Sequence, residues 1–304
     1  HKHTVGLVMD PTSVQEKKSL LSYLLPTSNR KFTVAFLYPK SPEESDWIYA
    51  HELGRNYLEE TFPEQMKTIC CVSGVCEENV EDVLSEVIRN GADIVFEVAP
   101  QMMKPSLKIA VDHPDVKILN CTLNTSHKYI RTYYARMYEA KFIAGVIAGA
   151  LADNNKIAYI ADYPIYGMIA NINAFALGAS FTNPRAQIYL EWSTKKDYDR
   201  EHFLTENDIS VVSDQDMITP SDTKRQFGLY RIEEGRTLNL AMPLWNWGIF
   251  YEKMIQSILA GSYQTEGNSE DRALNYWWGM SAGVIDMICS NNVPAGVRRL
   301  ADHL

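Results

Sequence analysis

Val34-Ala-Phe-Leu-Tyr38, Pro39-Lys-Ser-Pro-Glu-Glu-Ser-Asp46 and Trp47-Ile-Tyr-Ala-His-Glu-Leu-Gly-Arg-Asn-Tyr57 follow one another in the chain. The first run is apolar and typical of a strand, and two prolines close it. From Trp47 onward, apolar residues recur at the spacing of a helix. In open α/β sheets, ligands bind beyond the carboxyl ends of the strands, which is where the indole of Trp47 would face a planar ligand. The local pattern equally allows Trp47 to pack on its own sheet.

Strand and helix signals alternate along the 304 residues of the chain. We expect strands at residues 4–9, 32–38, 68–73, 93–98, 117–121, 156–161, 187–191, 209–213, 228–232 and 238–242. We expect helices near residues 15–25, 46–62, 77–90, 101–113, 136–152, 165–180, 197–206, 247–261 and 293–303. This alternation predicts an α/β fold with parallel sheets joined by right-handed crossovers. The length suits two lobes, and Asn154-Asn155 mark the start of the second α/β unit.

The composition excludes several classes of function. The chain has 29 basic and 38 acidic residues, a net charge of −9, and no long run of Lys and Arg, which argues against nucleic-acid binding. The longest apolar run, residues 142–152, is shorter than the roughly 20 residues that a membrane helix needs. The spacing of the five cysteines fits neither a disulfide framework nor a zinc site.

The motifs of common enzyme classes are absent from the sequence. It contains neither a glycine-rich phosphate loop, nor a Gly-x-Ser-x-Gly elbow, nor a His-Glu-x-x-His pair. The pattern shows no nucleophile with a base beside it and no cluster of metal-ligating residues. We therefore expect a binding protein without a cofactor or metal, rather than an enzyme.

Polar and aromatic residues follow several of the predicted strands. His51 lies one turn into the helix after Trp47, Asp162 and Tyr163 follow the strand at 156–161, and Asp216 follows the strand at 209–213. Because strand ends meet at one edge of a parallel sheet, this pattern favours a shared ligand site. Structural roles are also open, since His51 fits a capping or surface position and Asp216 fits a helix cap.

Six segments carry a family resemblance. They are Asp46-Trp-Ile-Tyr-Ala-His-Glu-Leu-Gly54, Tyr134-Ala-Arg-Met-Tyr-Glu-Ala-Lys-Phe-Ile-Ala-Gly-Val-Ile-Ala-Gly149, Lys156-Ile-Ala-Tyr-Ile-Ala161, Asn171-Ile-Asn-Ala-Phe-Ala-Leu-Gly-Ala179, Trp245-Asn-Trp-Gly248 and Trp277-Trp-Gly279. Together they resemble the basic membrane protein (BMP) family, the purine-nucleoside-receptor group of ABC-transporter substrate-binding proteins. The resemblance covers roughly residues 32 to 304. It implies a type I periplasmic-binding-protein fold, with two Rossmann-like α/β lobes and a three-segment hinge.

The resemblance also implies lobe boundaries and a ligand position. We expect one lobe to comprise residues 1–128 and 247–270, and the other to comprise residues 129–246 and 271–304. In the family, the aromatic residue after the first strand stacks on a purine base, and Trp47 falls at that position.

Several family positions differ in this chain. Ile48 stands where the family often has an Asn or Thr that contacts the base, and Trp245 stands where nucleoside-binding members carry a lysine. The expected ribose-binding aspartate has no clear equivalent in residues 230–234. Loss of a cation and an anion that hold ribose, with gain of an indole, predicts a free nucleobase or another flat heterocycle.

The resemblance implies an extracytoplasmic solute-binding protein whose lobes close on a purine-type ligand, a nucleobase or nucleoside, for delivery to an ABC-transporter permease. We expect a monomer that is membrane-anchored as a lipoprotein or forms a surface domain. The alternative is a ligand-sensing domain of a transcriptional or signalling regulator with the same fold. The predicted ligand-binding residues are Trp47, Tyr49, His51, Asp162, Tyr163, Asp216, Trp245 and Asn246.

Overall fold

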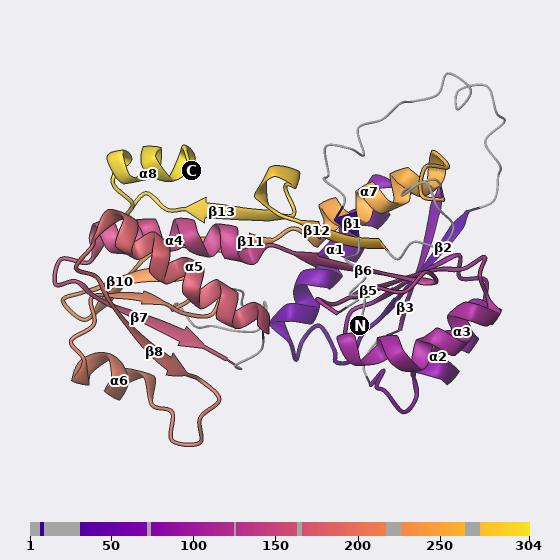
Figure 1. Ribbon diagram of the computed structural model, residues 1–304, viewed down its shortest axis with the longest axis horizontal. Helices are drawn as coiled ribbons and strands as arrows, with labels where there is room; N and C mark the ends of the chain where they lie inside the picture. The colour runs from indigo at the N-terminus through magenta and orange to yellow at the C-terminus, as the bar shows by residue number, and fades with distance from the viewer. Residues whose placement is uncertain are drawn as a thin grey trace. The chain divides into compact units, whose positions relative to one another are not determined.

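The chain divides into two compact units, each with its own β-sheet (Figure 1). A computed structural model describes residues 7–8, 31–71, 74–124, 126–162, 166–216, 226–264 and 274–304. The first unit takes the described residues up to Ala135 together with Asn246–Val284, and the second takes Arg136–Trp245 together with Ile285–Leu304. Within these ranges the chain passes between the units three times, after residues 135, 245 and 284.

The first unit contains a parallel sheet flanked by helices. In the described residues its strands are β1 (Leu7–Val8), β2 (Phe32–Leu37), β3 (Met66–Cys71), β4 (Ile94–Glu97), β5 (Lys117–Cys121), β6 (Ile130–Ala135) and β12 (Leu274–Trp278). Their order across the sheet is β1-β12-β6-β5-β4-β2-β3, and every pairing is parallel. The helices are α1 (Asp46–Thr61), α2 (Val80–Arg89), α3 (Met103–Asp112) and α7 (Trp247–Leu259), with short 3-10 turns at Pro100–Met102 and Met280–Ala282.

The strand–loop–helix stretch folds as the sequence predicts. The last four residues of β2 are buried, as in a strand that is covered on both faces. Helix α1 begins at Asp46 because the Ser45 side chain accepts a hydrogen bond from the backbone N–H of Ile48 at 3.3 Å. This cap places Trp47 in the first turn of the helix.

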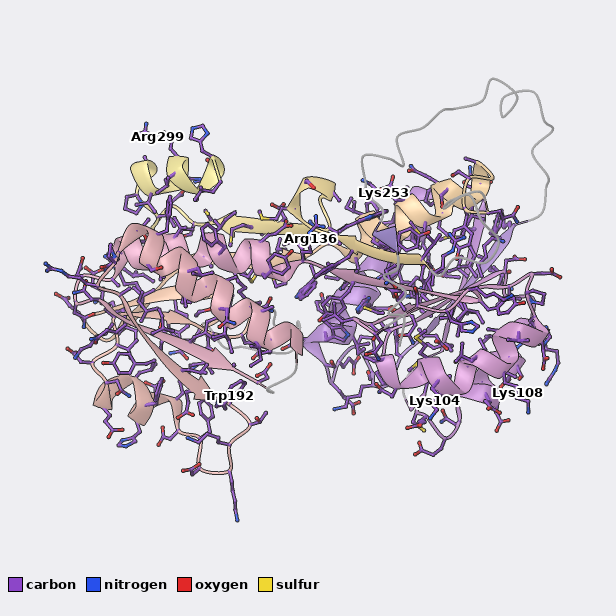
Figure 2. All side chains as sticks on the ribbon, in the orientation of Figure 1. Lys104, Lys108, Arg136, Trp192, Lys253 and Arg299 are labelled. Carbon is purple, nitrogen blue, oxygen red and sulfur yellow. The ribbon has the colours of Figure 1, made fainter. Side chains whose placement is uncertain are left out.

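Helix α3 shows how the apolar pattern orients the helices. Lys104 and Lys108, one turn apart, are exposed and point away from the sheet (Figure 2). Met103, Ser106 and Ala110 of the same helix are buried. The helix therefore turns one face to the core and the other to solvent.

The second unit contains a mixed sheet. In the described residues its strands are β7 (Lys156–Ala161), β8 (Gln187–Trp192), β9 (Val211–Ser213), β10 (Leu229–Glu233), β11 (Arg236–Trp245) and β13 (Ile285–Cys289), in the order β13-β11-β10-β9-β7-β8. The helices are α4 (Met137–Leu151), α5 (Tyr166–Thr182), α6 (Arg200–Glu206) and α8 (Ala295–Asp302). Strand β7 pairs in parallel with β8 and β9, whereas the β9–β10, β10–β11 and β11–β13 pairings are antiparallel.

The prediction of parallel sheets is thus confirmed for the first unit and wrong for three of the five strand pairings of the second. The reason lies in the turn Glu234-Gly235, which joins β10 to β11 with φ angles of 50° and 73°. Two consecutive residues with positive φ form the tight hairpin turn that joins antiparallel neighbours. A parallel connection would need a much longer crossover.

Helices α4 and α5 lie side by side in very close contact (Figure 1). A Cβ atom at Gly145 would lie 2.0 Å from the carbonyl oxygen of Phe175, and one at Gly178 would lie 2.0 Å from that of Phe142. Because these glycines have no side chain, the backbone of the other helix can lie directly against them. No residue with a side chain carbon fits these two places without separating the helices.

The unit boundaries differ from the expected lobes at two strands. The sequence placed residues 129–135 and 271–278 in the second lobe, but they contain β6 and β12, which pair with each other in the first sheet. Neither strand was predicted, and neither was β13. Of the N-terminal elements, only Leu7–Val8 of the expected strand is described, and the expected helix near 15–25 lies outside the described residues.

Candidate functional site

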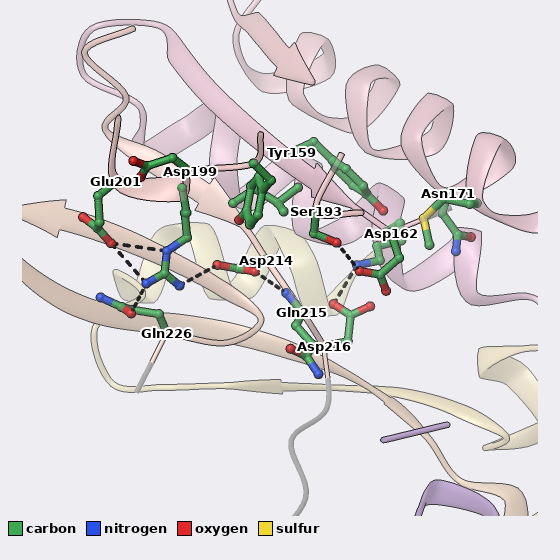
Figure 3. Close-up of a pocket in the computed structure, with 15 residues that line it drawn as sticks. Tyr159, Asp162, Asn171, Ser193, Asp199, Glu201, Asp214, Gln215, Asp216 and Gln226 are labelled. Carbon is green, nitrogen blue, oxygen red and sulfur yellow. Dashed lines mark hydrogen bonds and ion pairs between the residues drawn. The ribbon is translucent and has the colours of Figure 1, made fainter. Parts of the chain in front are cut away.

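The described part of the second unit contains a pocket of about 380 Å³ at the carboxyl ends of β7, β8 and β9 (Figure 3). Helices α4, α5 and α6 also contribute to its walls. The lining residues are Lys141, Tyr159, Ile160, Asp162, Met168, Asn171, Ser193, Tyr198, Asp199, Arg200, Glu201, Asp214, Gln215, Asp216 and Gln226. This is the edge at which open α/β sheets bind ligands.

Lys141 and Asp216 form an ion pair in the pocket, with 2.6 Å between Nζ and Oδ1. Burial by itself lowers the pKa of Lys141, but the attraction of Asp216 and of Tyr159 raises it overall. Burial raises the pKa of Asp216, and Lys141 opposes that rise. The ammonium group therefore stays charged at neutral pH and holds the carboxylate beside it.

A second polar network surrounds Arg200 at the start of α6. Its guanidinium lies 3.3 Å from Oδ2 of Asp214 and 3.1 Å from Oε1 of Glu201, and it also donates to Gln226. Tyr230 donates to the same oxygen of Asp214 at 2.9 Å. These hydrogen bonds pair the guanidinium with groups of the protein itself. They also connect α6 to the residues that follow β9 and precede β10.

Asp162 follows β7 and is exposed at the pocket. One of its carboxylate oxygens accepts a hydrogen bond from Ser193 Oγ at 2.7 Å, and its carbonyl oxygen accepts one from Thr194 at 2.6 Å. The structure thus brings two predicted site residues, Asp162 and Asp216, into one pocket. Tyr163 lies outside the described residues.

Trp47 belongs to an aromatic group in the first unit. Its indole lies edge-on to His51 at 4.8 Å and to Trp247 at 5.6 Å, and it is stacked with Tyr134 at 6.0 Å between ring centroids. Its Nε1 donates to the carbonyl oxygen of Val98 at 3.4 Å. The side chain is partly buried, so Trp47 packs on its own unit and still leaves part of its surface exposed.

His51 lies beneath Trp47 and is fully buried. Its ring stacks on Trp247 at 4.5 Å, and its Nδ1 is 2.6 Å from the hydroxyl of Tyr251. Burial lowers the pKa of His51 well below its ordinary value, so the imidazole is neutral. Among the described residues nothing bonds its Nε2. A surface role is therefore wrong, and a ligand-binding role stays a prediction.

The other predicted residues are not among those that line the pocket. Tyr49 is partly buried on α1 of the first unit. Trp245 ends β11, and Asn246 follows it at a crossing between the units. Asn246 donates to the carbonyl oxygens of Gly283 and Val284, at 3.2 Å and 2.8 Å. Neither Trp245 nor Asn246 is among the residues that line the pocket.

Sequence reasoning missed Lys141, Arg200 and Tyr159 as pocket residues. A signal for Lys141 is visible, because it is a lone cation in the mostly apolar segment of residues 140–152 and a buried charge needs a partner. That partner, Asp216, follows 75 residues later, so the pattern of the helix alone does not identify it.

Two α/β units of this kind form the type I periplasmic-binding-protein fold, which solved solute-binding proteins share. One from Conexibacter woesei aligns with a TM-score of 0.66 and 12% sequence identity, over 90% of this chain and 94% of that one. Residues 31–227 match the Bmp family, described as ABC transporter substrate-binding protein PnrA-like. The chain therefore belongs to the Bmp family of ABC-transporter substrate-binding proteins, which bind solutes and are not a class of enzymes.

The names of two curated relatives give different ligands. A purine-binding protein of Brucella abortus is 24% identical over 91% of this chain and 80% of its own length. A putative ABC transporter glucose-binding protein of Haloferax volcanii is also 24% identical, over 85% of this chain and 67% of its own length. Within the described ranges, no helix has the length and apolar character needed to cross a membrane.

Proposed function

We propose that this chain is an extracytoplasmic solute-binding protein that binds a purine-type ligand, a nucleobase or a nucleoside, for uptake by an ABC transporter. The observation that carries the proposal is the polar pocket at the strand ends of the second unit, in a chain of the Bmp family. The Brucella relative, named for purine binding, supports the ligand class. Closure of the two lobes on the ligand stays a prediction.

The pocket suits a compact ligand with several hydrogen-bonding groups. Its volume of about 380 Å³ lies in the range of small-molecule sites. Carboxylates, amides and hydroxyls supply acceptors and donors, and the rings of Tyr159 and Tyr198 supply apolar wall. A permease partner, a lipoprotein or surface-domain anchor and a monomeric state are parts of the same proposal. A ligand-sensing domain of a regulator stays the alternative, because a solved transcriptional activator of Bacillus halodurans shares the fold.

Calorimetric titration tests the ligand class. We expect adenine, hypoxanthine, adenosine, inosine or guanosine to bind the purified chain with a dissociation constant in the micromolar range or below, and native mass spectrometry to show any ligand retained through purification. Glucose serves as the comparison ligand because of the Haloferax relative. Binding of glucose without any of the five purines would contradict the proposal.

Trp47 is proposed as the stacking residue for the base. Replacing it with alanine is expected to weaken purine binding by about 1–3 kcal/mol, or roughly 5- to 150-fold, which is the usual contribution of an aromatic side chain stacked on a base. Trp47→Phe keeps an aromatic face and is expected to retain most of the affinity. Titration of both variants checks this, with thermal melts to separate lost stacking from lost packing. Unchanged affinity of a folded Trp47→Ala protein would leave Trp47 with a packing role alone.

A further inference from the structure

A buried lysine is unusual in the apolar helix α4. The Lys141 side chain is 4% exposed, and Ile143 and Ala144 of the same helix are buried and apolar. Replacement of buried ion pairs by apolar residues of similar size is often neutral or stabilising. The stability of the unit therefore gives no reason for Lys141, whereas its place in the wall of the pocket gives one.

The two members of the ion pair differ in their access to the pocket. The Asp216 side chain is 21% exposed, about five times the exposed fraction of Lys141. One N–H of the ammonium group is directed at Asp216 and a second at the hydroxyl of Tyr159, so a third is left for a ligand, and the carboxylate has further lone pairs. The Lys141 Nζ also lies 5.4 Å from the centre of the Tyr159 ring. A ligand atom beside the Asp216 carboxylate can therefore contact both a donor, the ammonium group of Lys141, and an acceptor, the carboxylate itself.

We propose that Lys141 and Asp216 together recognise a hydroxyl group of the ligand, an inference that rests on the proposed function. A hydroxyl accepts a hydrogen bond from the ammonium group and donates one to the carboxylate, so it satisfies both members at once. The guanidinium of Arg200 is already bonded to Asp214, Glu201 and Gln226. Lys141 is accordingly the cation that meets the ligand.

The net charge of the pocket points to a neutral ligand group. Five acidic residues line the pocket against two basic ones, which gives a formal charge of −3. The acidic residues are Asp162, Asp199, Glu201, Asp214 and Asp216, and the basic ones are Lys141 and Arg200. An excess of like charge opposes an anionic group such as a phosphate. The sugar hydroxyls of a nucleoside are neutral and offer both a donor and an acceptor.

This assignment reverses the ligand preference inferred from the sequence. The Trp at position 245 suggested that the cation for ribose is lost and that a free nucleobase binds. Lys141 and Asp216 supply a cation and an anion from α4 and from the end of β9. A ligand that carries hydroxyl groups is therefore favoured over one that does not.

Titration of two purines that differ in their hydroxyl groups tests the inference. The wild-type chain is expected to bind adenosine about 10- to 100-fold more tightly than 9-methyladenine, because hydrogen bonds to charged groups contribute that much. The double variant Lys141→Met with Asp216→Asn removes both charges and leaves no unpaired buried ion. It is expected to lose this preference while its affinity for 9-methyladenine changes less than about threefold.

A matched control removes a different paired cation. Arg231 pairs with Glu233 at 3.1 Å outside the pocket lining, and Arg231→Met is expected to keep the wild-type preference. If the folded double variant still prefers adenosine, or if the wild type binds both purines equally, the inference is overturned and the proposed function stands. If the wild type binds glucose but no purine, the proposed function fails, and the inference survives only if the double variant loses glucose. If the wild type binds neither a purine nor glucose, both the inference and the proposed function are overturned.

Discussion

Replacing Gly178 with alanine is expected to lower the free energy of unfolding of the second unit by about 3 kcal/mol or more, at or above the upper end of usual overpacking costs. The new Cβ would lie 2.0 Å from the carbonyl oxygen of Phe142 and 3.0 Å from the backbone nitrogen of Val146. Backbone atoms cannot swing aside as side chains do, so α4 and α5 must move apart. Chemical denaturation followed by circular dichroism measures the loss.

Gly296 provides the control for this prediction. It also lies in a helix, α8, but a Cβ there would have no heavy atom within 4 Å. Gly296→Ala is expected to leave stability unchanged or raise it by up to about 1 kcal/mol, because alanine favours the helix. Equal effects of the two substitutions would show that the close approach of α4 and α5 does not limit residue size.

The second large effect concerns Glu97, a buried carboxyl group in the first unit. Its Oε2 and the carbonyl oxygen of Met102 both lie within hydrogen-bonding distance of Ser106 Oγ. The serine hydroxyl has one proton and a carbonyl only accepts, so both bonds form together only when Glu97 carries a proton. Burial raises the pKa of Glu97 to about 7, which agrees with this count.

We expect Glu97→Gln to remove a pH dependence of stability. The folded state keeps a proton on Glu97 that the unfolded state releases near pH 4.5, so the stability of the wild type falls as the pH rises from about 4.5 to 7. The difference between a pKa of 4.5 in the unfolded chain and one of about 7 in the folded protein corresponds to about 3 kcal/mol. Glutamine stays neutral and can keep the bonds to Ser106 and Asn120, so the variant gains stability relative to the wild type over this range.

Denaturation curves at pH 5 and pH 8 check the expectation. The difference in unfolding free energy between Glu97→Gln and the wild type is expected to change by about 2–3 kcal/mol between the two pH values. The exposed Glu64 gives the control, and Glu64→Gln is expected to show no such change. A difference that is the same at both pH values would mean that Glu97 is charged in the folded protein.

Much of the fold follows from local pattern. The helices predicted at 46–62 and 247–261 are present as α1 and α7, because their apolar residues recur at helical spacing. The hairpin of β10 and β11 was read as two strands without their antiparallel pairing, although Glu234-Gly235 carries the turn signal. Strand β12 was missed because its place in the sheet depends on β6, far away in the sequence.

Two of the residues that line the pocket were predicted from the sequence. Asp162 and Asp216 were found because each follows a recognisable strand, and parallel strands place their ends together. The burial of His51 and the partner of Lys141 depend on contacts with distant elements, α7 for the first and the end of β9 for the second. Neither the burial of His51 nor the partner of Lys141 can be recognised from the residues of one helix or strand alone.

The pairing of β6 with β12 has a consequence for biosynthesis. Arg131 donates a hydrogen bond to Tyr276 at 2.7 Å across these strands, and the two residues are 145 positions apart. During translation β6 leaves the ribosome long before β12 exists, so this edge of β6 in the nascent first unit has no partner strand until residues 274–278 are made. Because an unpaired strand edge can pair with another chain, the interval between the synthesis of β6 and that of β12 is the stage at which edge-to-edge aggregation is favoured.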